Sequence, residues 1–80
     1  MATFELTLSL TNTSEEPFEY VLEPWTITVV VPPKSTVKTY FATPQYMSIP
    51  ITHKKGQVVV EAWEGCHPEE IYLDDERIVG

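Results

Sequence analysis

The sequence predicts a small all-β domain, an antiparallel β-sandwich of seven or eight short strands spanning residues 1–80. Apolar and polar residues alternate with a period of two along most of the chain, as in half-buried strands. Turn-forming residues recur about every ten residues, the spacing of a sandwich or a small β-barrel. The chain has seven prolines and three glycines, which suits short strands and stiff turns better than long helices. Because the sequence does not fix strand order, Greek-key and immunoglobulin/cupredoxin-like sandwiches and a small barrel all fit.

The first half of the chain contains four expected strands, at 4–11, 18–23, 26–31 and 36–42. A polar segment, 12–17, ends the first strand, and we expect the second strand to run antiparallel to the first across it. Pro24 follows the second strand, and a proline, which cannot donate a ladder hydrogen bond, belongs at an edge or a bulge. The third strand is rich in β-branched residues and ends at Pro32-Pro33.

The second half predicts a strand at 47–52, where Pro50 indicates an edge, and another at 58–63 after a polar loop. The last stretch has two interpretations. Pro68-Glu69-Glu70 has the features of the first turn of a helix, but the apolar residues that follow do not share one helical face. An acidic turn at 74–76 between two apolar runs favours a terminal hairpin instead.

The charge excludes several classes of partner. Twelve acidic residues against five basic ones give a net charge of −7 at neutral pH. Such a surface repels phosphate groups, so we expect no binding to nucleic acid or to membranes. Cys66 is the one cysteine, which rules out an intrachain disulfide, and the start of the chain lacks the features of a signal peptide. We therefore expect a cytoplasmic protein, in which the sequon Asn12-Thr13-Ser14 is a turn.

Potential metal ligands gather at Cys66 and His67, and His53 is the other histidine. Thiolate and imidazole suit zinc or copper, but the ligand spacing of a structural zinc site or a blue-copper site is absent. Adjacent residues on an extended chain point to opposite sides, so Cys66 and His67 are poorly placed as nucleophile and base. The chain also lacks a nucleophile elbow and a glycine-rich phosphate loop. We expect no enzymatic activity and no cofactor.

Trp25, Tyr40 and Trp63 are the candidate binding residues among the aromatic side chains. On one exposed face they would form a platform for sugars or a hot spot for a protein partner, whereas buried tryptophans would close the ends of the sandwich. Edge strands offer a second route to binding. A sandwich that does not close into a barrel has four edges, and we expect Pro24 and Pro50 to protect two of them. Any long unguarded edge invites strand addition from a partner or a second copy.

Several short motifs resemble those of a group of short, uncharacterised bacterial β-sandwich proteins. They are an Asn-x-Ser turn, a Glu-Pro-Trp step, a proline-containing turn and a late valine-rich strand with tryptophan, at Asn12-Thr13-Ser14, Glu23-Pro24-Trp25, Pro32-Pro33 and Val58-Val59-Val60-Glu61-Ala62-Trp63. The resemblance implies a β-sandwich and no particular activity. Thr26 and Lys34 depart from it, because both occupy positions where that group has glycine.

Three functions remain open at this point. The leading hypothesis is a non-catalytic protein-interaction or assembly module, since the pattern is all-β and no catalytic constellation is visible. The alternatives are a small metal-binding domain that uses the Cys66-His67 loop with His53, and a carbohydrate-binding module that uses exposed tryptophan and tyrosine side chains.

Overall fold

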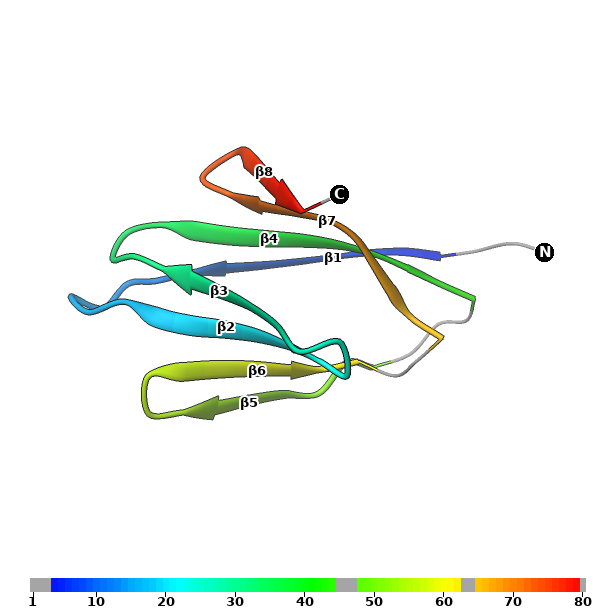
Figure 1. Cartoon of the computed structure of the whole chain (residues 1–80), viewed down its shortest axis with the longest axis horizontal. Coiled ribbons are helices and arrows are strands. Elements are labelled where there is room, and N and C mark those ends of the chain that lie inside the picture. Colours follow the sequence, from blue (N-terminus) through cyan, green and yellow to red (C-terminus); the bar gives the residue numbers. More distant parts are fainter. Residues whose placement is uncertain (1–3, 45–47, 63–64, 80) are drawn as a thin grey trace.

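The computed structural model describes residues 4–44, 48–62 and 65–79, and these form eight strands and no helix (Figure 1). The strands are β1 (Phe4–Thr11), β2 (Phe18–Glu23), β3 (Ile27–Val31), β4 (Thr36–Thr43), β5 (Ile51–Lys54), β6 (Gln57–Glu61), β7 (His67–Leu73) and β8 (Glu76–Val79). The all-β prediction is confirmed. Within the same ranges there is no helix long and apolar enough to span a membrane.

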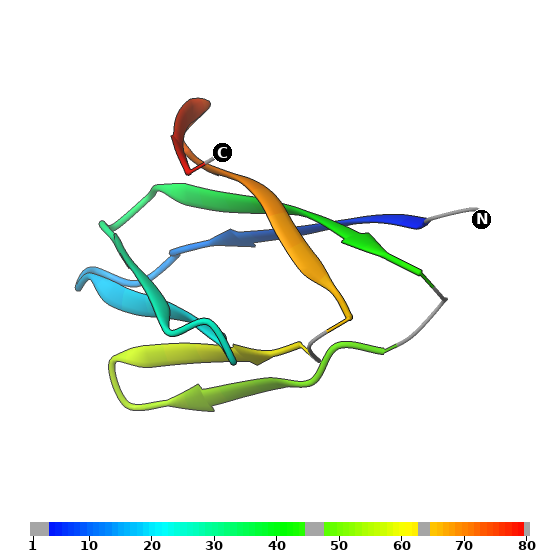
Figure 2. The same ribbon diagram turned by 45° about the vertical axis from the view of Figure 1, so that its right-hand side comes forward.

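Two four-stranded sheets face each other as the layers of an open sandwich (Figures 1 and 2). Their strand orders are β1-β4-β7-β8 and β3-β2-β6-β5, and neither sheet closes into a barrel. β2 and β6 run parallel, while the other neighbouring strands are antiparallel. The expected pairing of the first two strands is wrong, because β1 pairs with β4 and β2 with β3. The six-residue connection 12–17 is long enough to cross between sheets about 10 Å apart.

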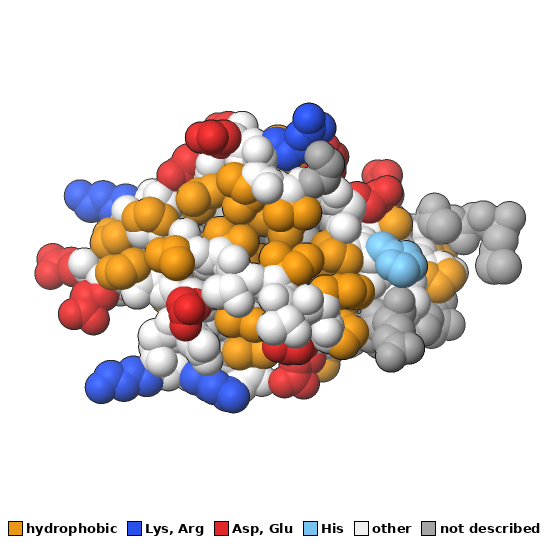
Figure 3. Space-filling model, in the orientation of Figure 1, with side chains coloured by type: hydrophobic (Ala, Val, Ile, Leu, Met, Phe, Trp, Pro, Cys, Tyr) orange, Lys and Arg blue, Asp and Glu red, His pale blue; other side chains and the backbone are white. Residues whose placement is uncertain are grey.

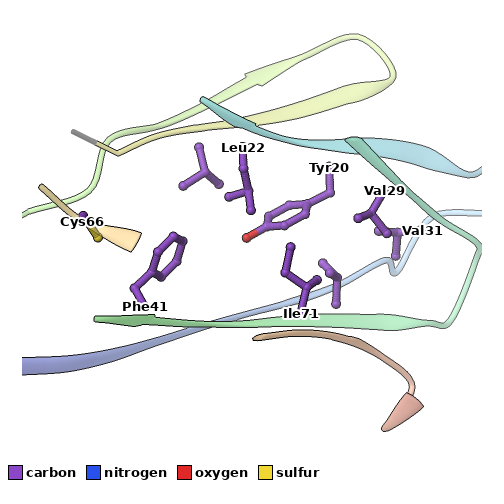
Figure 4. Close-up of a cluster of buried hydrophobic side chains, with 9 residues drawn as sticks. Tyr20, Leu22, Val29, Val31, Phe41, Cys66 and Ile71 are labelled. Atoms are coloured by element: carbon purple, nitrogen blue, oxygen red, sulfur yellow. The ribbon is translucent and has the colours of Figure 1, made fainter. Parts of the chain in front are cut away.

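The core lies between the inner faces of the two sheets (Figure 4). The Tyr20 hydroxyl reaches from β2 to the Thr39 hydroxyl of β4 at 2.6 Å, so one buried hydrogen bond joins the two layers. Both side chains are fully buried. The apolar members of the core come from five strands and the segment before β7: Tyr20, Leu22, Val29, Val31, Val37, Phe41, Val60, Cys66 and Ile71.

The Asn12 side chain organises the crossing between the sheets. Its Nδ2 donates to the carbonyls of Glu16 (2.8 Å) and Val31 (3.0 Å), and its Oδ1 accepts from the Ser14 N–H (2.9 Å) and hydroxyl (2.6 Å). Asn12 is 2% exposed, so all of these bonds lie in or near the core. The turn expected at Asn12-Thr13-Ser14 is confirmed.

The strand after Pro50 begins later than predicted. β5 starts at Ile51 and runs through His53 and Lys54, which the sequence placed in a loop. Pro50 has no N–H to give to a ladder, and its carbonyl instead accepts from the Glu61 N–H at 2.9 Å. β5 and β6 are then joined by a two-residue turn that contains Gly56, with φ of +74°.

The end of the chain is the hairpin of β7 and β8, and the helical interpretation of 68–79 is wrong. Leu73 pairs with Glu76, so Asp74 and Asp75 form a two-residue turn. Their φ values are +49° and +68°, the left-handed values that a type I′ turn requires at both positions. Aspartate tolerates this region better than most residues, which explains why an acidic pair ends the strand.

Thr26 and Lys34 occupy positions where the short bacterial proteins that this sequence resembles have glycine. Both residues have a left-handed backbone, with φ of 57° and 68°. For a β-branched residue such as Thr26 this conformation is an outlier.

We expect Thr26→Gly to raise the free energy of unfolding by about 1 kcal/mol in urea titration, because glycine reaches this φ without steric cost. Thr28→Gly, in the adjoining strand, is the matched control and should lower it by about 1 kcal/mol. Equal stability of Thr26→Gly and the parent protein would contradict the expected strain.

Candidate functional site

The potential metal ligands lie at different ends of the sandwich. Cys66 is fully buried and lies beside Phe41 in the core (Figure 4). The adjoining His67 is exposed and pairs with Ala42 near the end of β4. His53 lies on β5 and lines a hollow with Leu10 and other residues near the end of β1, the end that pairs with the start of β4. In the described ranges no three His, Cys, Asp or Glu side chains group as metal ligands.

Burial raises the pKa of the Cys66 thiol, which keeps it protonated and poorly nucleophilic. We expect iodoacetamide to alkylate Cys66 at least about tenfold more slowly in native protein than in urea, since reaction requires opening of the core. Mass spectrometry of quenched time points measures the two rates. Ser9→Cys adds an exposed thiol on β1 and should be labelled rapidly as a control. Fast stoichiometric alkylation of native Cys66 would contradict its placement.

The candidate aromatic residues do not form one platform. Trp25 is half-buried in the connection between β2 and β3 and packs against the core. Tyr40 instead belongs to the outer face of the β1-β4-β7-β8 sheet, where it meets Tyr72 edge to face, with ring centroids 5.8 Å apart. Trp63 lies outside the described residues. Sequence reasoning missed Tyr72, because its proximity to Tyr40 depends on the pairing of β4 with β7.

Around Tyr72 the outer face is polar. The Tyr72 hydroxyl donates to Glu70 Oε2 at 3.0 Å, and Arg77 Nη1 lies 3.5 Å from the same oxygen. The hydrogen bond to Glu70 raises the pKa of Tyr72. Asp74 accepts from the Thr36 N–H at 2.9 Å, and the bonds from Ser35 and Thr36 lower the pKa of its carboxyl group. These acids are already engaged with neighbouring groups of the fold.

The four strand edges differ in how they are protected. β5 and β8 are four residues long and carry charged side chains, Lys54 on β5 and Glu76 and Arg77 on β8, which discourage strand addition. β1 has eight residues and carries Glu5. β3 consists of an isoleucine, a threonine and three valines, without charge, proline or glycine. Among the four edge strands of the described residues, β3 is the one without a charged side chain.

The direction of the main-chain groups in β2 follows from its pairing with β6. The Glu19 N–H donates to the Gly56 carbonyl (2.9 Å), and the Ala62 N–H donates to the Glu23 carbonyl (3.0 Å). Main-chain groups alternate in direction along a strand. Tyr20, one residue after Glu19, therefore directs its N–H and C=O toward β3.

Tyr20 lies opposite Val29, so these two residues form a hydrogen-bonded pair. Thr28 and Val30 then point their N–H and C=O groups away from β2, toward the side of β3 with which no described strand pairs. We call this side the β3 free edge. The Val30 side chain is 56% exposed. Figure 3 shows hydrophobic side chains gathered in a band over β3 and the space between the sheets.

These strands define a small, open, two-sheet β-sandwich with one parallel pair. No protein-family model, curated protein or solved structure matches the chain. The resemblance to the short bacterial proteins stays a prediction, and the interpretation of the β3 free edge rests on its geometry and chemistry.

Proposed function

We propose that this protein is a non-catalytic interaction module that binds an extended protein segment along the β3 free edge. The observation that carries the proposal is the outward direction of the Thr28 and Val30 main-chain groups on an uncharged strand. An extended segment would satisfy these groups by adding a fifth strand to the sheet. Main-chain hydrogen bonds would provide affinity, and the exposed Val30 side chain would favour apolar neighbours.

The alternatives gain no comparable support from the described residues. His53 lies at the other end of the sandwich from Cys66, and the Cys66 thiol faces the core. Trp25 packs against the core, away from the outer face that carries Tyr40. Metal binding and carbohydrate binding would each require residues to lie next to one another that are far apart in this fold.

Selection from a displayed library of random peptides tests the proposal. We expect the selected peptides to bind the parent protein and to shift the NMR signals of the Thr28 and Val30 amides. Val30→Pro should weaken binding at least about tenfold, because it removes a donor from the free edge and leaves the ladder with β2 intact. Ser9→Pro is the matched control, since the Ser9 N–H points to the free edge of β1. Equal binding to Val30→Pro would refute the proposal.

The direction of the Ser9 N–H follows from the pairing of β1 with β4, just as the directions of the β3 main-chain groups follow from the pairing of β3 with β2. The Asn12 N–H donates to the Ser35 carbonyl (2.9 Å) and the Lys34 N–H donates to the Asn12 carbonyl (2.8 Å), so Asn12 directs both groups toward the segment before β4. The residues of β1 at odd positions, Ser9 among them, therefore point their main-chain groups away from β4. The two proline variants remove equivalent donors from two different edges.

A further inference from the structure

We infer that the segment that occupies the β3 free edge is β3 of a second copy of the same chain, paired antiparallel about a twofold axis at Val29. This inference rests on the proposed function and specifies its partner. The resulting dimer would extend the β3-β2-β6-β5 sheet into a continuous eight-stranded sheet. In such a symmetric pairing the free edge of β3 in each copy forms hydrogen bonds with the same edge of the other copy. Neither copy of β3 then has an open edge.

The register follows from the directions of the main-chain groups. Thr28 and Val30 are the residues of β3 whose main-chain groups face the free edge, and Thr28 of one copy opposite Val30 of the other brings both into hydrogen-bonded pairs. Each such pair exchanges two N–H···O bonds, and the twofold axis generates the pair twice. Thr26 already has a left-handed backbone and Pro32 lacks an N–H, so the ladder ends at both sides of this core.

The side chains at the interface are self-complementary. On the outer face, the Thr28 side chain of each copy would lie beside the Val30 side chain of the other. On the inner face, the two copies of Val29 would meet about the twofold axis. Threonine and valine have similar shapes and strong β propensity, so the strands pair without a void or a clash.

The distribution of charge permits a second copy to pair at this edge, although the net charges of the two copies repel. Two chains of net charge −7 repel, so self-association requires an edge far from the carboxylates. β3 has no ionisable side chain, and the neighbouring strand β2 carries Glu19 opposite Val30. In the dimer the two β2 strands are three strand spacings apart, roughly 14 Å, which exceeds the Debye length of roughly 8 Å at physiological salt. A basic segment at the β3 free edge would find no adjacent carboxylate on β3 to pair with.

β8, the edge strand of the facing sheet on the same side as β3, is compatible with the proposed dimer. A hollow lined by Leu10 of β1 and His53 of β5 shows that these two edges share one side of the sandwich, so β8 and β3 share the other. The charges that β8 brings to that side, Glu76 and Arg77, are opposite in sign. They add little net repulsion between the two copies.

Sedimentation equilibrium over about 10 µM to about 1 mM protein tests the inference. We expect the mass to rise with concentration from 9.1 kDa toward twice that value. Dimerisation should strengthen with added salt, because the copies carry like net charge, whereas binding of a basic partner would weaken. Thr28→Pro and Val30→Pro should each raise the dissociation constant at least about tenfold, while Ser9→Pro leaves it within about threefold.

Amide hydrogen exchange gives a readout that needs no variant. The Thr28 and Val30 amides should exchange more slowly as the parent protein is concentrated, whereas the Val29 amide, already bonded to β2, should not change. A monomeric mass at all concentrations, or a dimer that survives both β3 proline variants, overturns the inference. A dimer lost only in Ser9→Pro assigns self-association to β1 and also overturns it. In each case, peptide binding that Val30→Pro abolishes would leave the proposed function standing.

Discussion

Replacement of Asn12 by alanine is expected to lower the free energy of unfolding by about 3 kcal/mol. The side chain makes four hydrogen bonds at 2% exposure, and alanine removes all of them. The Val31 carbonyl, which already faces Phe18 in the ladder with β2, would lose its second donor in the core. The loss of several hydrogen bonds at one buried position, each worth about 1 kcal/mol, accounts for the size of the effect.

Urea unfolding followed by tryptophan fluorescence measures this effect. Thr13→Ala is the matched control, because Thr13 is exposed in the same turn and its loss should change stability by less than about 0.5 kcal/mol. Asn12→Asp has nearly the same shape but replaces the Nδ2 donor with an acceptor facing the Glu16 and Val31 carbonyls. It should therefore destabilise the protein at neutral pH. A loss below about 1 kcal/mol in Asn12→Ala would show that Asn12 does not anchor the crossing.

The sequence predicted most of the individual strands, because alternation of apolar and polar residues is a local property. In β4, for example, Val37, Thr39 and Phe41 face the core as the alternation predicts. The order of the strands in the sheets could not be predicted from such local patterns. The pairing of β2 with β6 joins segments about forty residues apart, and no local pattern encodes a parallel neighbour.

At the candidate site too, local features could be predicted from the sequence, whereas features that depend on pairing between distant segments could not. The β-branched composition of β3 was visible in the sequence, but its position at an edge depends on the order of the whole sheet. The two prolines expected to protect edges, Pro24 and Pro50, lie in connections next to β3 and β5 and not within those strands. Asn12 was predicted only as a turn residue, because its partner carbonyl at Val31 lies nineteen residues further along the chain.

Open edges also explain why a small chain needs internal polar anchors. An 80-residue domain buries a limited fraction of its surface, so its margin of stability is small. Two sheets with four open edges can slide relative to each other unless directional contacts fix them. The Asn12 crossing and the Tyr20 to Thr39 bond supply such contacts, one at an end of the sandwich and one in the core. This arrangement holds the sheets in register while the β3 free edge stays available.

The Tyr20 to Thr39 contact predicts a loss of stability in alkali. Burial, opposed by the weaker effect of the Thr39 bond, raises the pKa of Tyr20 from 10.0 to about 12. The unfolded chain therefore releases this proton near pH 10 and the folded chain near pH 12. The stabilisation is fully present below pH 10 and is lost as the pH rises to 12. The expected loss over that interval is roughly 2–3 kcal/mol.

Urea unfolding at pH values from 7 to 12 separates Tyr20 from the other tyrosines by comparison with Tyr20→Phe. That variant should be about 1–2 kcal/mol less stable at pH 7, because it leaves the Thr39 hydroxyl unpaired in the core. Its stability should fall less between pH 10 and 12 than that of the parent protein, since no buried phenol remains at this position. Tyr20→Phe combined with Thr39→Val removes both polar groups and should recover most of the loss at pH 7. Parallel pH profiles for the parent and Tyr20→Phe would show that the Tyr20 hydroxyl reaches solvent in the folded protein.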